Sequence, residues 1–567
     1  MKTYSKDISV VLGGAAGQGI QTVEALLMTV LKRAGHRVFA SKEYMSRIRG
    51  GSNSTEIRIT QNPVAAFVSR IDFLFVMDAG VVEHLRDRIT KETLILGDAR
   101  KLGNQNEYQI IDVPFSQFTQ ELGNPIYTST LAVGVALGML GVERKFLDQY
   151  LAARFARKGE EVVQKNLEAA LKGHNFGTHL AYEQGFEVHL TTNKEVTEEL
   201  LLSGGDALGY GALMAGCNYI SSYPMSPGTA LFTFLAEKGA EFGVVVDQAE
   251  DEIAAINQVL GAWYAGARGL VTTSGGGFAL MCEGVSLAAI IETPIVIHIG
   301  MRPGPATGLP TRTEQADLNL ALYAGHGEFP RVIYAPGTAE EAFSCIQAAF
   351  KMADAYQIPA FVLTDQFLID SIRSFPIDNL QIEKVKHYIV ESNADYVRYQ
   401  VTESGVSPRA IPGEGKGMVT VDSDEHTEDG RITESAEVRT VMQDKRMRKA
   451  IALEEQAIVP SVLGSIKDAE VVVVSWGSNK QLVEEVLENI NSPKLAALHF
   501  AQVYPLAPDA KKWLQDKKVI VLENNATGQF ATLLRDQYDL ESTESILQYN
   551  GSPFSVEETI SRIQNFI

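Results

Sequence analysis

The sequence predicts an α/β protein made of three parallel-sheet domains, and three observations support this. Short apolar runs alternate with segments of helical periodicity along most of the chain. In the middle of the chain, three of these runs end in glycine or proline loops that precede helices: YISSYPMSP, GLVTTSGGG and PIVIHIGMRPGPATG. At 567 residues, the chain is also too long for one hydrophobic core.

The amino-terminal segment contains candidate anion-binding groups. A predicted strand, Ile8–Leu12, runs into a glycine-rich loop and then a helix, an arrangement that presents backbone N–H groups to a phosphate. The loop matches neither a P-loop nor GxGxxG, and close strand–helix packing is the other explanation for its glycines. Arg47 and Arg49, beside the next glycine turn, suit a phosphate, a carboxylate or an interdomain contact.

The domain boundaries follow from changes in periodicity and composition. Helical periodicity continues to about residue 177 and then fades, and the stretch after residue 373 is polar and acidic. We therefore expect a first domain over 1–177, a linker over 178–200, a second domain over 201–373, a polar insert over 374–455 and a third domain over 456–567. Within the insert, His426 stands among five acidic residues, which suits either a cation site or a solvated loop.

The stretch from Gly204 to Leu318 is the expected ligand-facing part of the chain. In an open parallel sheet, ligands bind outside the carboxyl ends of the strands. The three glycine and proline loops follow three such ends, so we expect them to meet at one edge of the second domain.

Composition excludes several classes of function. The net charge is −20, which disfavours nucleic acid and anionic membrane as partners. Three distant cysteines give neither a disulfide framework nor a local iron–sulfur or zinc site. No signal peptide or membrane-length apolar stretch is evident. We expect a cytoplasmic protein with no metal ligands of its own.

Several motifs together resemble one family. GGAAGQG with SRIRGG is similar to a γ-type domain, and the motifs of the central stretch are similar to a thiamine-diphosphate pyrimidine-binding domain: YPMSP, QAEDEIAAINQ, TSGGGFALM and GPATGLPTRTEQADL. The last domain is similar to a transketolase C-terminal domain. Along essentially its whole length, the chain resembles the α subunits of 2-oxoacid:ferredoxin oxidoreductases in which a γ domain is fused ahead of the α part.

The resemblance implies CoA-dependent oxidative decarboxylation of a 2-oxoacid, and the closest likeness is to the 2-oxoglutarate branch. It implies thiamine diphosphate with Mg²⁺ as cofactor, CoA as co-substrate and ferredoxin as electron acceptor. The cofactor carries the hard chemistry, and the protein positions it. The same chemistry on pyruvate, branched-chain or aryl 2-oxoacids stays open, as does a non-catalytic paralogue that binds CoA or a nucleotide.

The resemblance also assigns candidate site residues. Glu252 is expected to hydrogen-bond the thiamine pyrimidine; Glu250 is the alternative, and both carboxylates would also favour a helix N-terminus electrostatically. Arg312 is expected to bind the substrate carboxylate as a guanidinium fork, or else to pair with Glu314. The other substrate candidates are Tyr223, Ser226, Pro227 and Thr229, the other thiamine candidates are Thr273 and Ser274, and the CoA candidates are Gly17, Gln18, Gly19 and Arg49.

Two features of the sequence bear on the choice of substrate and on the need for a partner chain. YPMSP and TSGGG replace the family's usual YPITP and TSGPG, which leaves the preferred 2-oxoacid side chain open. A GDG motif with a downstream Asn and a set of cluster cysteines are also missing. The resemblance therefore implies a β subunit that holds the diphosphate, Mg²⁺ and a [4Fe-4S] cluster, in an αβ or α₂β₂ enzyme, and we expect the single chain to be inactive.

Overall fold

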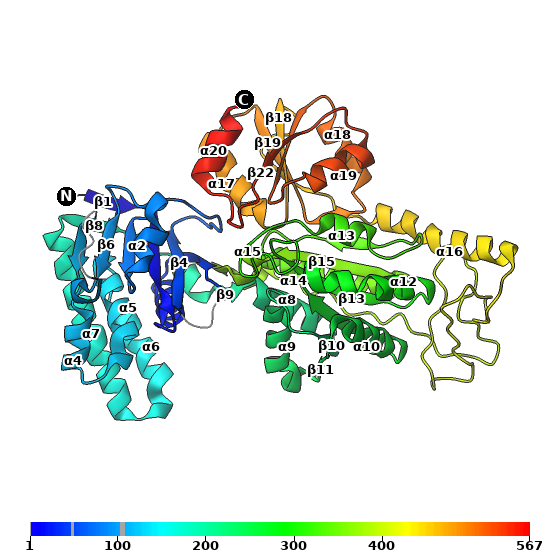
Figure 1. Cartoon of the computed structure of the whole chain (residues 1–567), viewed down its shortest axis with the longest axis horizontal. Coiled ribbons are helices and arrows are strands. Elements are labelled where there is room, and N and C mark those ends of the chain that lie inside the picture. The colour runs from blue at the N-terminus through cyan, green and yellow to red at the C-terminus, as the bar shows by residue number, and fades with distance from the viewer. Residues whose placement is uncertain (1, 47–49, 103–107) are drawn as a thin grey trace. The chain divides into compact units, whose positions relative to one another are not determined.

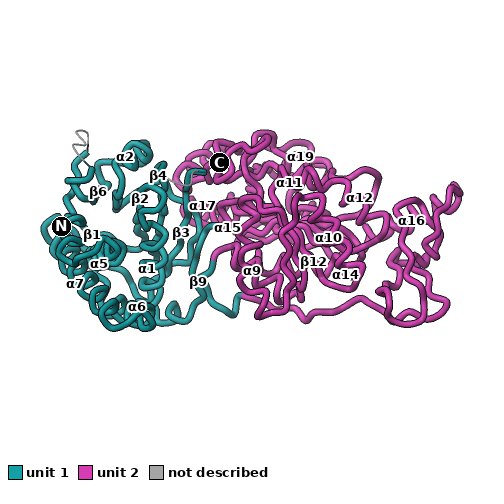
Figure 2. Tube along the Cα trace, turned by 60° about the horizontal axis from the view of Figure 1, so that its bottom comes forward, with its two compact units in different colours: residues 1–202, 370–379 teal, residues 203–369, 380–567 magenta. Residues whose placement is uncertain are grey.

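A computed structural model describes residues 2–46, 50–102 and 108–567, and it shows an α/β protein with three mostly parallel sheets (Figure 1). The predicted fold class is confirmed. The chain forms two compact units, one of residues 1–202 with 370–379 and one of residues 203–369 with 380–567 (Figure 2). The five sequence segments proposed above stay a prediction.

The first unit contains an eight-stranded sheet and a two-stranded parallel ribbon. In the larger sheet β2 pairs in parallel with β5 and antiparallel with β4. The order of its strands is β7 (Ile110–Asp112), β6 (Leu94–Gly97), β5 (Phe73–Val76), β2 (Asp7–Ala16), β4 (Gly50–Thr60), β3 (Arg37–Glu43), β16 (Ile372–Phe375) and β9 (Leu200–Ser203), while β1 (Lys2–Ser5) and β8 (Phe186–His189) form the ribbon.

Two helices of the first unit, α5 (Thr128–Met139) and α7 (Glu160–Glu183), pack closely because both carry paired glycines. A β-carbon on Gly138 of α5 would lie 2.2 Å from the carbonyl oxygen of His174, and one on Gly177 of α7 would lie 2.1 Å from that of Val135. The two backbones therefore touch where any larger residue would separate them. The helices are α1 (Ile20–Arg33), α2 (Gly80–His84), α3 (Ala99–Leu102), α4 (Phe115–Glu121), α5 (Thr128–Met139), α6 (Lys145–Phe155) and α7 (Glu160–Glu183).

The second unit is organised around a seven-stranded sheet whose strands are parallel except for the last, β20. Their order is β11 (Val245–Gln248), β10 (Tyr219–Ser222), β12 (Gly269–Thr273), β13 (Ile295–Met301), β15 (Pro359–Asp365), β14 (Val332–Tyr334) and β20 (Gln502–Tyr504). The accompanying helices are α8 (Gly204–Met214), α9 (Thr229–Phe242), α10 (Glu252–Tyr264), α11 (Gly275–Leu280), α12 (Cys282–Ile290), α13 (Leu318–Tyr323), α14 (Ala339–Tyr356), α15 (Gln366–Asp370) and α16 (Ala436–Glu455).

A five-stranded sheet closes the second unit, and only its edge strand β17 is antiparallel. Lys480, at the start of α17, forms an ion pair with Glu341 of α14, so this sheet domain contacts the helices of the larger sheet. Its strands run in the order β17 (Ser461–Leu463), β19 (Leu495–Phe500), β18 (Val471–Trp476), β21 (Lys518–Glu523) and β22 (Glu544–Leu547), and its helices are α17 (Lys480–Ile490), α18 (Lys511–Leu514), α19 (Gln529–Tyr538) and α20 (Val556–Gln564).

The polar insert is held on the sheet by buried charges. Arg409 of the insert forms an ion pair with Asp354 on α14, and Lys445 and Lys449 of α16 both bind Glu292. Breaking a buried pair of this kind leaves an uncompensated charge, so each contact fixes the position of the insert.

The solvated-loop interpretation was wrong for the ring of His426, although its neighbours Asp424, Glu428 and Asp429 are exposed. Its ring is fully buried and lies 3.8 Å, centroid to centroid, from the ring of Tyr399, while Nδ1 contacts the carbonyl oxygen of Asp424 at 2.9 Å. Stacking on Tyr399 therefore buries the ring within an otherwise acidic loop. Within the described ranges, no group of three His, Cys, Asp or Glu side chains is placed to hold a metal ion, and no helix is long and apolar enough to cross a membrane.

Candidate active site

Three loops meet at the carboxyl edge of the seven-stranded sheet. They follow β10, β12 and β13, which are neighbours in parallel register. The loop after β10 contains the YPMSP turn, the one after β12 is the triple-glycine turn, and the long one after β13 spans residues 302–317. The edge that the sequence marked as ligand-facing is thus formed as one surface.

Glu252 lies beneath the triple-glycine turn. It is the first residue of α10, follows the helix cap Asp251, and is 3% exposed. A β-carbon on Gly277 would lie 2.5 Å from Glu252 Oε1 and 2.2 Å from Thr273 Oγ1. The carboxylate and the hydroxyl therefore both lie against that glycine. Glu250, in contrast, is exposed. The geometry therefore favours Glu252 over Glu250 as the site carboxylate.

Three polar atoms at this turn lack hydrogen-bond partners among the described residues. They are Glu252 Oε1, Asp317 Oδ2 and the hydroxyl of Ser274, which is fully buried. A buried polar group without a partner costs about 1–3 kcal/mol. In native structures a ligand, an ion or ordered water satisfies groups of this kind.

A second carboxylate, that of Asp317, lies against the same turn, and the sequence did not identify it as a site residue. A β-carbon on Gly275 would lie 2.3 Å from both carboxylate oxygens of Asp317. At both Gly275 and Gly277, any side chain would therefore clash with a carboxylate. Burial raises the pKa of Asp317 to about 6, against the opposing charge of Arg302. Burial, and then the charge of Asp317, raises the pKa of Glu314 to about 7.

This raised pKa predicts a pH-dependent effect of Asp317→Asn on stability. The ordinary pKa of the carboxyl is near 3.8, so between pH 4 and 6 the folded chain binds more protons than the unfolded one. The wild type therefore loses stability as pH rises through this window, by about 3 kcal/mol for this group. The variant should gain Tm relative to the wild type from pH 4 to pH 8. A Tm difference that does not change with pH would contradict this account.

Two contacts hold the YPMSP turn in place. Arg302 Nη1 donates to the carbonyl oxygen of Ser226 at 2.7 Å, and Pro227 packs on Gly300. Tyr223 is exposed, and Thr229 begins α9. The turn thus presents Tyr223, Ser226 and Thr229 at the same edge as Glu252. Sequence reasoning missed Arg302, although its position directly after a buried strand was a usable signal.

A chain of hydrogen bonds supports the turn from inside the sheet. Thr272 Oγ1 donates to the carbonyl oxygen of Gly228 at 3.1 Å and contacts His298 Nδ1 at 2.7 Å, and His298 Nε2 contacts Thr364 Oγ1 at 2.8 Å. Burial lowers the pKa of His298 to about 3, so the ring stays neutral and orders these strands without adding charge.

Arg312 lies in the 302–317 loop, close to the five-stranded domain. A β-carbon on Gly551 would lie 3.1 Å from Arg312 Cβ, and Thr313 N donates to the carbonyl oxygen of Gly551 at 3.1 Å. The side chain of Arg312 is partly exposed. The loop that carries it is thus placed by two domains of the second unit.

The glycine-rich loop of the first unit opens on a separate cavity of about 360 Å³. Gly17 and Gly19 line it with positive φ angles of 90° and 82°. Gln18 is not part of the lining; its Oε1 accepts from Ala15 N at 2.9 Å and closes the turn. Gly13 is needed for close packing, because a β-carbon there would lie 2.2 Å from Val81. Close packing thus explains Gly13, while anion binding at Gly17 and Gly19 stays a prediction. Arg47 and Arg49 lie outside the described residues.

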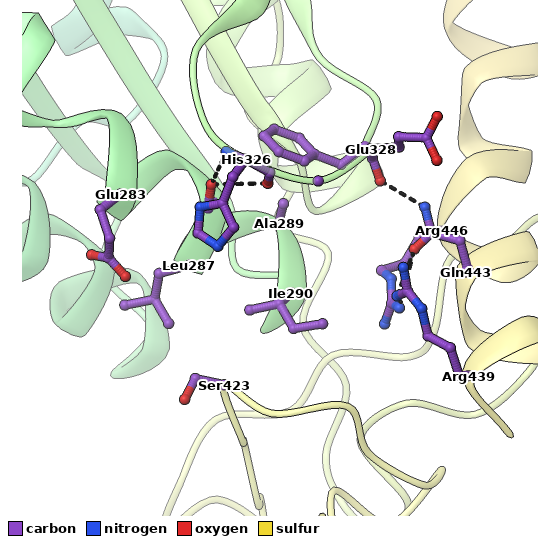
Figure 3. A pocket seen from close by; sticks show the side chains of 13 residues that line it. Glu283, Leu287, Ala289, Ile290, His326, Glu328, Ser423, Arg439, Gln443 and Arg446 are labelled. Carbon is purple, nitrogen blue, oxygen red and sulfur yellow. Dashed lines mark hydrogen bonds between the residues drawn. The ribbon is translucent and has the colours of Figure 1, made fainter. Parts of the chain in front are cut away.

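Another cavity, of about 230 Å³, lies between α12, the loop after α13 and α16 (Figure 3). Gln443 Nε2 donates to the carbonyl oxygen of Glu328 at 2.8 Å across it. Its arginines, Arg439 and Arg446, are both paired with Glu425. Both guanidinium groups of this cavity are thus paired within the chain.

Two protein-family models match the chain. The model described as Pyruvate flavodoxin/ferredoxin oxidoreductase, thiamine diP-bdg, matches residues 210–445, which include the whole candidate site. The model described as Pyruvate ferredoxin/flavodoxin oxidoreductase matches residues 9–176.

Relatives align along almost the whole chain. The 2-oxoacid:ferredoxin oxidoreductase 2, subunit alpha, of Aeropyrum pernix is 32% identical, with 98% of each chain covered. The 2-oxoglutarate oxidoreductase subunit KorA of Mycobacterium tuberculosis is 26% identical, covering 98% of this chain and 90% of that one. A solved structure, the 2-oxoglutarate:ferredoxin oxidoreductase from Magnetococcus marinus with 2-oxoglutarate, coenzyme A and succinyl-CoA bound, is 29% identical with a TM-score of 0.92 over 99% of both chains.

These findings agree with the geometry of the site. The matched thiamine-diphosphate-binding domain contains the buried carboxylate of Glu252, the triple-glycine turn and the YPMSP turn at one sheet edge. On full-length identity to a curated alpha subunit and on this site, the chain belongs to the 2-oxoacid:ferredoxin oxidoreductase family, as an alpha subunit.

Proposed function

We propose that this alpha subunit takes part in the CoA-dependent oxidation of 2-oxoglutarate to succinyl-CoA and CO₂. The observation that carries the proposal is the buried Glu252 carboxylate, held over Gly277 with one oxygen unpartnered among the described residues. The 2-oxoglutarate and succinyl-CoA bound to the Magnetococcus marinus enzyme support this choice of substrate.

The residues around the turn fit the pyrimidine end of thiamine diphosphate. Glu252 and Ser274 offer a buried carboxyl and a buried hydroxyl, each with an oxygen that has no partner among the described residues, and the glycines leave room for a flat ring to approach the backbone. When bound, thiamine diphosphate supplies the electron sink that decarboxylation of a 2-oxoacid requires. Glu252 then holds a proton toward the ring, and Thr273 borders the same place.

The substrate is held on the side of the YPMSP turn. Ser226 and Thr229 offer hydroxyls to the 2-oxoacid, and Tyr223 and Pro227 border it. Arg302 keeps the turn in place through its bond to the Ser226 carbonyl. Arg312 is proposed to bind a carboxylate of the substrate, because a guanidinium fork matches that group in two hydrogen bonds.

A partner subunit is proposed to cover this edge. The segments that form the site carry exposed apolar side chains, namely Tyr223, Ile253, Leu280 and Leu309. Exposed apolar surface of this kind suits an interaction with a partner. The proposed occupant is the beta subunit, which would contribute Mg²⁺, the diphosphate contacts and a [4Fe-4S] cluster that passes electrons to ferredoxin.

CoA is proposed to bind at the glycine-rich loop of the first unit. Gly17 and Gly19 open on the 360 Å³ cavity at the start of α1, where the backbone N–H groups of a helix N-terminus favour a phosphate. Gln18 shapes the turn, and Arg49 is the proposed guanidinium partner.

Substrate choice tests the proposal. In the complex with its beta subunit, the wild type should oxidise 2-oxoglutarate with a higher kcat/KM than pyruvate, branched-chain or aryl 2-oxoacids. Arg312→Met should lower kcat/KM for 2-oxoglutarate about 10- to 100-fold, since one charge-assisted contact contributes about 1.5–3 kcal/mol. A smaller effect is expected on pyruvate, which lacks the second carboxylate. Preference for pyruvate, or an equal loss on both acids, would refute the assignment.

A further inference from the structure

Gln315 connects the 302–317 loop to the five-stranded domain. Its side chain is fully buried. Nε2 donates to the carbonyl oxygen of Trp476 at 2.9 Å, while Oε1 accepts from Asn479 Nδ2 and from Asn524 N, both at 3.0 Å. The amide of Gln315 thus supplies both a donor and an acceptor with two lone pairs.

The backbone around Gln315 is held by the same domain. Gln315 N donates to the carbonyl oxygen of Asn524 at 2.6 Å, and Asn525 Nδ2 donates to the carbonyl oxygen of Gln315 at 3.1 Å. One residue further on, Gln529 Nε2 donates to the carbonyl oxygen of Ala316 at 2.8 Å. The loop is therefore fixed in backbone as well as in side chain.

The five-stranded sheet is shaped to receive this side chain. Its partners lie at or just after the carboxyl ends of β18 and β21, which are parallel neighbours. Gly477, directly after β18, has φ 58°, and a β-carbon there would lie 2.5 Å from Gln315 Nε2. A residue other than glycine at 477 would be strained and would displace the amide.

We propose that Gln315 is a positioning residue, through which the five-stranded domain sets the place of Arg312 and Asp317 at the active site. Arg312 precedes it by three residues and Asp317 follows it by two, where the latter lies over Gly275. The loop has no regular secondary structure of its own between β13 and α13, so its position depends on such contacts. The proposal rests on the proposed function, in which this loop binds the 2-oxoacid.

The test compares Gln315→Met with Lys480→Met in the complex with the beta subunit. Lys480 also joins the five-stranded domain to the larger sheet, but through Glu341 on α14 rather than through the loop. Gln315→Met should raise KM for the 2-oxoacid at least about tenfold, because small misplacements of binding groups have large effects. KM for CoA should not change. Lys480→Met should lower Tm and leave both KM values within about twofold of the wild type.

A second variant keeps the test decisive if Gln315→Met fails to fold. Gln315→Glu retains the acceptor oxygen but, when ionised, places a negative charge against the Trp476 carbonyl. When protonated, it again carries a donor. Its KM for the 2-oxoacid, divided by that of the wild type at each pH, should therefore fall toward one as pH decreases from 8 to 6. A ratio that does not depend on pH would overturn the positioning role.

Hydrogen exchange separates this proposal from the proposed function. Amides of residues 303–317 should exchange at least about tenfold faster in the Gln315 variants than in Lys480→Met. Faster exchange with no turnover of any 2-oxoacid, even by the wild type, would refute the proposed function and leave the loop contact supported. Unchanged exchange and unchanged KM in Gln315→Met, or an equal KM rise in Lys480→Met, would overturn the inference.

Discussion

Glu252→Gln is expected to lower kcat for 2-oxoacid oxidation by about 10²–10⁴-fold in the complex with the beta subunit. The carboxyl is buried beneath the triple-glycine turn and its Oε1 is without a hydrogen-bond partner in the described part of the chain. A glutamine of nearly the same shape cannot hold and release a proton there, and loss of a positioned acid or base has an effect of this size.

Glu250→Gln is the matched control for this change. Glu250 lies two residues earlier, carries the same charge and is exposed. Its replacement should leave kcat within about threefold of the wild type. The measurement is steady-state viologen reduction with saturating 2-oxoglutarate and CoA. Equal effects of the two substitutions would mean that the carboxylates act only through the helix N-terminus, which was the alternative explanation.

Gly277→Ala is expected to have an effect nearly as large, about 10²-fold on kcat, without adding or removing a charge. Its new methyl group would lie 2.5 Å from Glu252 Oε1 and 2.2 Å from Thr273 Oγ1, so both side chains must move. Displacement of a catalytic group by about 1 Å lowers rates by this order. Gly277 lies inside α11, where alanine would otherwise favour the helix.

Gly276→Ala controls for the backbone effect of the same substitution one residue earlier. The nearest atom to a β-carbon at Gly276 is the carbonyl oxygen of Ala306, at 3.8 Å, which is an ordinary contact. This variant should keep kcat within about threefold and should be as stable as the wild type or more stable. Comparable losses in both variants would show that the helix, rather than the contact with Glu252, requires the glycines.

The fold and part of the site could be predicted because they depend on local patterns. Apolar runs that end in glycine or proline located β10, β12 and β13, and parallel strands bring their loops to one edge. The position of Glu252 at the start of a helix followed from the same periodicity. Its role stays a prediction, as do those of the other candidate residues.

The remaining parts of the site depend on contacts between distant segments, which no local pattern records. Asp317 is important because it packs on Gly275, and Arg302 because it reaches the carbonyl of Ser226. The acidic residues around His426 suggested a solvent-facing loop, but stacking on Tyr399 buries the ring. In each case, a tertiary contact decided what composition and spacing left open.

The most direct test of the proposed function is CoA-dependent viologen reduction with 2-oxoglutarate, measured for the purified chain alone and for its complex with the beta subunit. We expect activity only in the complex, and loss of it when the complex contains Glu252→Gln. Turnover by the lone chain, or a complex that binds CoA yet oxidises none of the 2-oxoacids, would contradict the proposed function.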